Sequence, residues 1–235
     1  MEYIDFVKAL QKALNDMGEK LTVDGDPGPK TRAALAKYDV ELLLKKAELP
    51  ETPAPSGDFF GAPWIGANLD LLGRDETDKE LNARYVPEWS KEGLPGYKTL
   101  AGNRHAWCSV RANADRRKVG VSTTNSAAAA SWSSYGRKCP FWFGAALDIR
   151  HKGGGRHICD FLYWIDEKKK IAATLDGNRG NKFCVAKTDL SGAGDTLVAG
   201  PRWPKEMPDG QLVSMQDVLA KYPILKVGSV ASGTR

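Results

Sequence analysis

Cysteine, histidine and long apolar runs are all scarce in this sequence. Its 235 residues include four cysteines and three histidines, and neither a C-x-x-C pair nor an H-E-x-x-H motif occurs. A disulfide scaffold, structural zinc and zinc-dependent hydrolysis are therefore not expected, and no motif requires a cofactor. No stretch approaches ~18 consecutive apolar residues, so stable membrane insertion is not expected either. The first residues, Met1 to Asp5, lack the basic stretch and apolar core of a secretory signal, so we expect no signal peptide.

The sequence does contain enough apolar material for a hydrophobic core. Hydrophobic residues make up 42% of the chain and charged residues 27%, which excludes a disordered or collagen-like protein. With roughly 150 residues in a typical domain, the length fits one large domain, or a small domain followed by a medium one.

The net charge of +5 is unevenly distributed. Residues 1–50 carry 8 Lys and Arg against 9 Asp and Glu, whereas the rest of the chain carries 26 against 20, a net charge of +6. A basic second part suits an anionic partner, of which nucleic acids, anionic lipids and acidic cell-wall polymers are the main classes. No helix-turn-helix, RNA-recognition or zinc-finger signature is present, so we expect no nucleic-acid partner.

Residues 1–49 have the pattern of a small helical domain. Apolar residues recur at helical spacing over residues 4–17, which predicts an amphipathic helix ended by Gly18. A turn-rich segment, 23–29, precedes a second helix that we expect from about Lys30. The apolar faces of the two helices consist of Val7, Leu10, Leu14 and Met17, and of Leu35, Tyr38 and Leu42.

The remainder of the chain predicts a linker and then a second, α+β domain. Residues 50–62 are rich in proline and glycine, which is typical of an extended, semi-stiff linker. A helix is expected over residues 64–72, and a sheet of antiparallel strands follows. The expected strands are 142–149, 157–165, 171–176, 182–186 and 197–203. The C-terminal segment, 205–235, contains one short helical stretch near Met215 to Tyr222 and has no assigned role.

The chemistry that this sequence favours is that of a nucleophilic cysteine. A thiolate is best placed at a helix N-terminus, with a histidine in hydrogen-bond reach and a polar residue to orient the ring. Cys139 precedes a proline, which disfavours helical backbone, and Cys159 and Cys184 fall inside expected strands. Cys108 precedes the segment 109–118, which can be helical, so Cys108 is the candidate nucleophile.

A candidate base for this cysteine is His157, which begins an expected strand. The next strand ends at Asp176 and is followed by Gly177 and Asn178. Because adjacent antiparallel strands lie side by side, either Asp176 or Asn178 can lie beside the imidazole and fix its tautomer. His151 is expected to be a solvated loop residue.

The first helix and the turn after it carry two motifs, V-x-x-L-Q-x-x-L and V-D-G-x-x-G-x-x-T, within residues 4–40. This segment resembles the peptidoglycan-binding domain found on many cell-wall hydrolases. The resemblance implies wall binding, with Asp24, Gly25 and Thr31 as candidate substrate-binding residues. The alternative is that these residues only build the helix pair, since Gly25 permits a tight turn and Thr31 can cap the second helix.

A second series of motifs follows in a fixed order. They are Pro63-Trp64-Ile65, Ala106-Trp107-Cys108-Ser109, Ser131-Trp132, Gly144 to Ile149, Arg156-His157-Ile158, Asp176 to Asn181, and Gly200 to Pro204. In this order they resemble papain-like cysteine amidases and peptidases of the NlpC and CHAP kind, most of all a phage- and prophage-associated branch. The resemblance implies Cys108 as nucleophile, His157 as general base and Asn178 as orienting residue, with Asp176 as its rival. Trp107 is a candidate substrate contact, although core packing is the commoner role of tryptophan.

The two resemblances together imply an endolysin-like peptidoglycan hydrolase. Its parts are a peptidoglycan-binding domain (1–49), a linker (50–62), a cysteine hydrolase domain (63–204) and an extension (205–235). The bond cleaved is an amide, as in an N-acetylmuramoyl-L-alanine amidase or a peptide-stem endopeptidase. We expect a monomer that stays in the host cytoplasm until the membrane is breached and then reaches the cell wall.

The segment after Cys108 supports an alternative. In the family this helix usually has an apolar face, whereas here Arg111, Asn113, Asp115 and Arg116 make it polar. This departure favours a catalytically inactive cell-wall-binding or phage structural protein that retains the fold.

Overall fold

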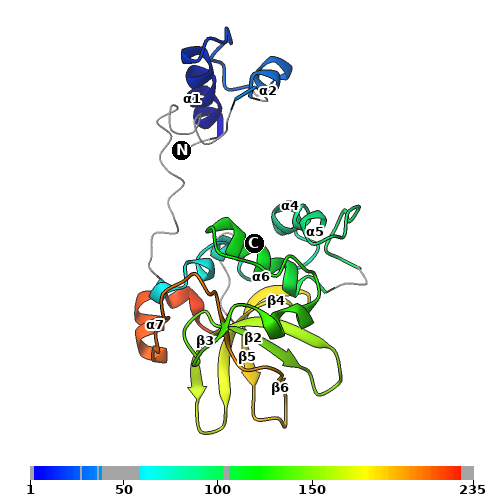
Figure 1. The fold of residues 1–235 in the computed structure, drawn as a ribbon, viewed down its shortest axis with the longest axis vertical. Coiled ribbons are helices and arrows are strands. Elements are labelled where there is room, and N and C mark those ends of the chain that lie inside the picture. Colours follow the sequence, from blue (N-terminus) through cyan, green and yellow to red (C-terminus); the bar gives the residue numbers. More distant parts are fainter. Residues whose placement is uncertain (1–2, 27, 36, 39–58, 103–105, 229–235) are drawn as a thin grey trace. The chain divides into compact units, whose positions relative to one another are not determined.

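The computed structural model describes residues 3–26, 28–35, 37–38, 59–102 and 106–228 (Figure 1). The chain divides into two compact units, Met1–Ser56 and Gly57–Arg235. Each unit has a hydrophobic core of its own. Among the residues just named, no helix has the length and apolar character that crossing a membrane requires.

The N-terminal unit contains two helices, α1 (Tyr3–Asp16) and α2 (Pro29–Leu35). The helix expected over residues 4–17 is confirmed to within one residue at each end. The helices pack through a small buried cluster of Ala13, Leu14 and Ala34. Gly18 follows α1 with a φ of 102°, a conformation that favours glycine, and so allows the chain to turn away. Leu42, expected on the second apolar face, lies outside the described residues.

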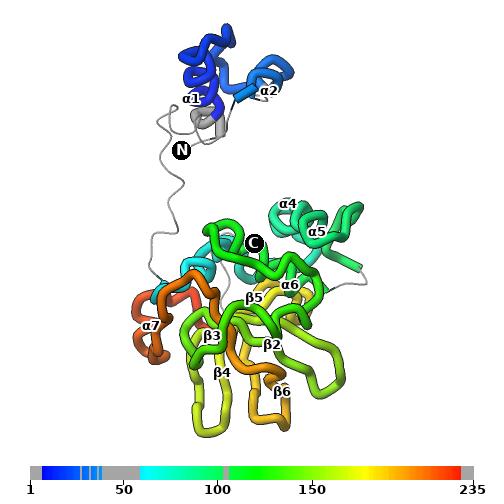
Figure 2. Tube along the Cα trace, in the orientation of Figure 1, coloured from blue at the N-terminus to red at the C-terminus, as the bar shows by residue number. Residues whose placement is uncertain are grey.

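The second unit is built on an antiparallel sheet, which confirms the expected α+β class. Its strands are β1 (Arg137–Lys138), β2 (Ala146–Arg150), β3 (Arg156–Asp166), β4 (Ile171–Arg179), β5 (Lys182–Asp189), β6 (Thr196–Leu197) and β7 (Arg202–Trp203). They are ordered β1-β7-β2-β3-β4-β5, with β6 also paired to β2. Strands β2 to β5 follow one another as consecutive hairpins, as the trace in Figure 2 shows.

Three differences from the expected strand boundaries bear on the fold and the candidate site. The strand expected from 142 begins only at Ala146, because Ala145 N–H bonds back to the Trp142 carbonyl at 2.9 Å in a turn. The strand expected over 197–203 is divided into β6 and β7 around Gly200, whose φ is 75°. Strand β4 continues past Asp176 to Arg179, which changes the surroundings of the candidate site.

Helices cover the sheet and complete its core. The α-helices are α4 (Lys79–Tyr85), α5 (Glu88–Lys91), α6 (Cys108–Lys118) and α7 (Met215–Lys221), and the short 3-10 helices are η1 (Phe59–Gly61), η2 (Pro63–Ile65), η3 (Leu69–Leu71), η4 (Ala129–Ser134) and η5 (Pro223–Leu225). Helix α6 lies against β3 and β4 (Figure 1). The single helix expected over residues 64–72 is wrong, because the backbone leaves helical geometry between η2 and η3.

Both ends of the described part of the second unit, 59–228, pack into its core. Residues 59–62 were expected in the linker, yet the Phe59 ring is buried and stacks on Tyr222 with 4.3 Å between centroids. The Tyr163 hydroxyl donates to the Leu225 carbonyl at 3.1 Å, and Leu225 is fully buried. The described part of the expected extension, 205–228, therefore belongs to the same folded unit.

The polar residues of α6 are buried against the sheet. Arg111 Nη1 donates to Asp160 on β3 at 2.6 Å and to Asp115 at 3.2 Å, and Arg116 Nη2 donates to the other Asp160 oxygen at 2.6 Å. These four side chains are at most 1% exposed. The unusual polarity of this helix therefore reflects two arginines and two aspartates that neutralise each other inside the fold.

Candidate active site

Cys108 is the first residue of α6, as the sequence predicts, and it is only 1% exposed. The first helical hydrogen bond runs from Arg111 N–H to the Trp107 carbonyl at 3.0 Å. The thiol therefore lies at the positive end of the helix dipole, where a thiolate is stabilised.

A glycine on β4 lets the start of α6 approach the sheet closely. A Cβ placed on Gly177 would lie 2.8 Å from Arg111 Cβ and 3.0 Å from the Trp107 ring. No side chain larger than hydrogen fits at that distance without displacing the helix. Gly177 thus determines how near Cys108 can come to the strand that carries Asp176.

His157 lies near the start of β3, and its ring is held by Asp176 on β4. The distance from His157 Nε2 to Asp176 Oδ1 is 2.8 Å, and both side chains are buried. The Thr174 hydroxyl donates to the other Asp176 oxygen at 2.5 Å. With Nε2 held by Asp176, Nδ1 is the ring nitrogen left free to interact with Cys108, whose pKa His157 lowers. Cys108, His157 and Asp176 are thus neighbours in this order.

The electrostatics of these three residues favour a thiolate–imidazolium pair. Burial opposes ionisation of Cys108, but the hydrogen bond and charge of His157 and the N–H groups of Ile158 and Ser109 outweigh it and lower the pKa of the thiol. Burial likewise works against the charged form of His157, but the bonds to Asp176 and Cys108 raise the pKa of His157 to about 10. The pKa of Asp176 is lowered despite burial, by His157 first and then Arg179.

Asn178 does not take part in this arrangement, and Asp176 occupies the place that the family resemblance assigned to it. The register of β4 and β5 shifts between Asp176 and Arg179, and Asn178 has a φ of 64°. Asparagine tolerates this left-handed conformation better than most residues. The bulge turns Arg179 to the side of Asp176, where its Nη1 lies 3.5 Å from Asp176 Oδ1 and 3.2 Å from Thr188 Oγ1.

Trp107 is a core residue in this structure, contrary to its expected role as a substrate contact. Its side chain is 1% exposed, and its ring stacks on Tyr85 with 6.0 Å between centroids. Burial of this large ring fixes the backbone at the helix start, which supports Cys108 indirectly. Asn103 and His105, which precede the helix start, lie outside the described residues. The backbone N–H of Cys108 is the donor that the helix start offers.

His151 is the residue that sequence reasoning missed. Its Nδ1 lies 2.8 Å from Asp195 Oδ1, and its ring centroid is 5.3 Å from that of His157. Asp195 also lies 3.7 Å from Arg179, so a second histidine–aspartate pair adjoins the first. Ile149 pairs with His157 across the β2–β3 hairpin. Because side chains alternate along a strand, His151, two residues after Ile149, lies on the same face of the hairpin as His157. A β2–β3 hairpin expected in this register would therefore have predicted that the two histidines are neighbours.

The site also contains a grouping with the chemistry of a metal centre. His157, Cys159 and Asp176 each offer a ligand atom, and these atoms lie within 4.8 Å of one another, all buried. The grouping shares its imidazole and carboxylate with the hydrogen-bonded pair of His157 and Asp176, so the same atoms cannot serve both at once. All four cysteines of the chain are free thiols.

The candidate wall-binding residues of the N-terminal unit are held together by Gln11. Its side-chain amide donates to Asp24 Oδ1 at 2.8 Å and to Thr31 Oγ1 at 3.3 Å, and its carbonyl accepts from Gly25 N–H at 2.9 Å. Gln11 and Thr31 are both buried, and they line a depression of about 360 Å³ together with Asp24 and Lys20. The structure brings the three expected residues together around a fourth, Gln11, which belongs to the first motif but was not singled out.

Comparison with known proteins gives one match. The family model described as "Predicted Peptidoglycan domain" matches residues 6–50. No curated protein and no solved structure matches the chain. The match covers the helix pair with its Gln11-centred turn, and it supports peptidoglycan as a binding partner and association with the cell wall.

Proposed function

We propose that this protein is an endolysin-like peptidoglycan hydrolase whose second unit cleaves an amide bond by cysteine catalysis. The observation that carries the proposal is that Cys108, at a helix start, adjoins a His157 whose ring is hydrogen-bonded to Asp176 on the neighbouring strand. This order of thiol, imidazole and carboxylate supports a papain-like cysteine amidase or peptidase of the NlpC and CHAP kind. The N-terminal family match supports the same substrate.

The proposed reaction is an acyl transfer in two steps. The Cys108 thiolate attacks the amide carbonyl, the carbon–nitrogen bond breaks, and the imidazolium of His157 gives its proton to the leaving amine. His157 then takes a proton from water, which attacks the thioester; the carbon–sulfur bond breaks, the acid is released and the thiolate–imidazolium pair is restored. The N–H of Cys108 is placed to donate to the oxyanion, and Asp176 holds the imidazole throughout. The scissile bond is either the muramoyl–alanine amide or a bond within the peptide stem.

The two units support each other in this function. A wall-binding unit keeps the catalytic unit at the surface of an insoluble substrate and raises its effective concentration there. The excess of basic residues beyond residue 50 favours approach to an anionic wall. We propose that the protein acts as a monomer, is held in the host cytoplasm and reaches the wall when the membrane is breached.

The decisive experiment compares two cysteine variants on purified cell walls. Cys108→Ala should abolish solubilisation of the walls. The full-length variant should still be pulled down by the walls. Cys139→Ala is the matched control, because burial raises the pKa of that thiol to about 12 and it is not among the three residues of the candidate site. Release of new amines by the Cys108→Ala protein at the unmodified rate would contradict cysteine catalysis. Mass spectrometry of the fragments would identify the bond.

A second candidate function is that of a wall-binding or phage structural protein without activity. The observation that favours it is burial: Cys108 is 1% and His157 is 5% exposed, so a substrate has little direct access to the sulfur. Iodoacetamide distinguishes the two candidates without any substrate. An active site predicts alkylation of Cys108 faster than that of a free thiol at neutral pH, whereas an inert buried thiol reacts more slowly.

A further inference from the structure

A pocket of about 270 Å³, called the basic pocket below, is lined by residues of α4, α5 and the second half of α6 (Figure 1). Cys108 begins α6 and Lys118 ends it, and a helix rises 1.5 Å per residue, so the two are about 15 Å apart along the axis. The basic pocket is therefore separate from the candidate active site. Its charged lining consists of one carboxylate, that of Glu88, and four cations, those of Arg84, Lys91, Arg117 and Lys118.

Two of these cations converge on one neutral oxygen. Arg84 Nη1 donates to Asn68 Oδ1 at 2.5 Å, and Lys118 Nζ donates to the same atom at 3.1 Å. The two nitrogens can be no further apart than the sum of these distances. A guanidinium and an ammonium this close repel each other, and the dipole of an amide oxygen does not neutralise their charges. The arrangement lacks a negative charge at the point where Arg84 and Lys118 meet.

The carboxylates on the other side of the pocket are already neutralised. Glu88 accepts from Lys91 Nζ at 2.7 Å and from one Nη atom of Arg117, whose other Nη atom donates to Glu92. These two cations and two anions balance one another. They leave no negative charge for the pair formed by Arg84 and Lys118.

Lys118 forms no ion pair with any carboxylate that the structure describes. Its ammonium donates to the Ala67 carbonyl and to Asn68, both of which are uncharged. Partial burial first, and then the charge of Arg84, lower the pKa of Lys118. Arg84 lies 3.4 Å from Asp70, but the Asp70 side chain is 60% exposed, so this ion pair is weak.

The helix dipole does not explain these positions. Basic residues in the last turn of a helix often donate to the last carbonyls of that helix and so complement its dipole. Lys118 is the last residue of α6, but its ammonium donates to two residues outside α6. Arg84, in the last turn of α4, likewise donates to Asn68 outside its own helix.

We propose that the basic pocket binds a phosphate group, held by Arg84 and Lys118. This site goes beyond the proposed hydrolysis and does not depend on it. A phosphate presents acceptor oxygens in several directions, so it can accept from cations that come from two different helices, whereas one guanidinium already satisfies a planar carboxylate. The phosphate belongs either to free phosphate and its monoesters or to the phosphodiester of an anionic polymer.

The test is calorimetric titration of the full-length protein with inorganic phosphate at constant ionic strength. One saturable site per chain is expected. Lys118→Gln should weaken the affinity about tenfold, because it removes the cation that has no carboxylate partner. Arg84→Gln should weaken it similarly. Lys118 is exposed, so its variant should keep the near-UV circular dichroism of the unmodified protein.

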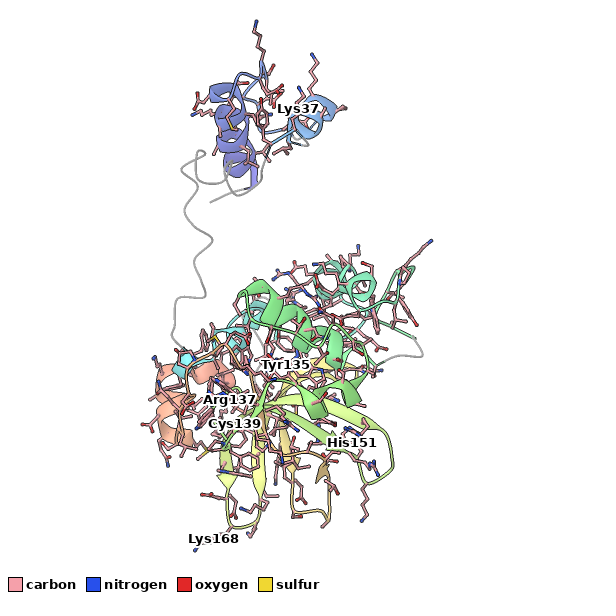
Figure 3. The ribbon with its side chains drawn as sticks, viewed as in Figure 1. Lys37, Tyr135, Arg137, Cys139, His151 and Lys168 are labelled. Atoms are coloured by element: carbon pink, nitrogen blue, oxygen red, sulfur yellow. The ribbon has the colours of Figure 1, made fainter. Side chains whose placement is uncertain are left out.

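The matched control is Lys168→Gln. Lys168 is an exposed lysine at the β3–β4 turn, well away from the helices that line the basic pocket (Figure 3). This variant loses the same charge as Lys118→Gln and should bind phosphate with unmodified affinity. An equal loss of affinity in the two lysine variants would mean that phosphate responds only to net charge, and it would overturn the site.

Two further titrations identify the chemistry of the ligand. Glycerophosphoglycerol, a phosphodiester, should bind as tightly as inorganic phosphate if the source is a polymer, and much more weakly if the source is free phosphate or a monoester. Acetate should bind much more weakly than either preferred ligand. Acetate that binds as tightly as phosphate, unmodified affinity in Lys118→Gln, or no saturable binding of either phosphate compound would overturn the proposal.

Discussion

His157 Nε2 and Asp176 Oδ1 are 2.8 Å apart inside the second unit, and this single contact determines which ring nitrogen faces Cys108. A carboxylate at Nε2 fixes the tautomer of the neutral ring and stabilises the charged ring. It also explains why burial alone does not keep His157 neutral, since the opposing partners raise its pKa to about 10.

The first prediction separates Asp176 from Asn178. Asp176→Ala should lower the rate of wall hydrolysis by about 10²-fold, because the imidazole loses the group that orients and charges it. Asn178→Gly retains the left-handed backbone and should change the rate less than about twofold. Initial rates of amine release from purified walls measure both. The opposite order of effects would return the orienting role to Asn178.

The second prediction concerns pH. The pKa of Cys108 is lowered in the folded protein, so its thiolate persists at pH values where a free cysteine is protonated, and alkylation should remain fast below pH 8.5. The pair is lost at the acidic end when the thiolate takes up a proton. At the alkaline end it is lost when His157 releases its proton near pH 10. A profile of iodoacetamide labelling against pH should show the lower limb, and wall hydrolysis should show both.

His157→Ala is the matched variant for this profile. Without the imidazolium, burial is the dominant influence and the midpoint of Cys108 alkylation should move to higher pH. An unchanged midpoint would mean that His157 does not control the ionisation of the thiol.

How far the sequence predicts this site depends on which interactions are local. The helix start at Cys108 and the strand start at His157 follow from local patterns, and the structure places both as expected. Local patterns do not decide between Asp176 and Asn178, because that choice depends on a bulge that turns Arg179 toward Asp176. A strand prediction that ends at Asp176 contains no information about that bulge.

The polar helix after Cys108 illustrates the same limit. Arg111, Asp115 and Arg116 suggest a solvated face when only their own segment is considered. Asp160, the partner of both arginines, lies 44 or more positions further along the chain, so only the tertiary fold reveals this pairing and its burial. The fold class and the N-terminal helix pair, which depend on short-range patterns, were predictable.

The third prediction tests this buried pairing. Asp160→Ala leaves Arg111 and Arg116 charged and without their shortest ion pairs, and it should destabilise the second unit by about 3–5 kcal/mol. Asp70→Ala removes an exposed carboxylate 3.4 Å from Arg84 and should leave the midpoint of denaturant unfolding unchanged. Near-UV circular dichroism follows the unit through its buried tryptophans. Equal midpoints for the two variants would show that α6 does not depend on the pairing.

The fourth prediction concerns the close approach at Gly177. Gly177→Ala places a methyl group 2.8 Å from Arg111 Cβ, and it should cost about 1–3 kcal/mol of stability by pushing α6 from β4. Because Cys108 is at the start of that helix, the alkylation rate should fall as well. Gly153→Ala is the control, since nothing lies within 4 Å of a Cβ there. An alkylation rate that is unchanged in Gly177→Ala would show that the thiol does not depend on this contact.

The last prediction concerns the wall-binding unit. Gln11→Ala removes the side chain that joins Asp24, Gly25 and Thr31, and it should abolish pull-down by purified walls because the turn loses its organising hydrogen bonds. Lys12→Ala changes the exposed neighbour on the same helix and should leave binding intact. Alkylation of Cys108, which belongs to the other unit, should be equal in both variants. Full wall binding by Gln11→Ala would mean that the depression beside Asp24 is not the surface through which this unit recognises peptidoglycan.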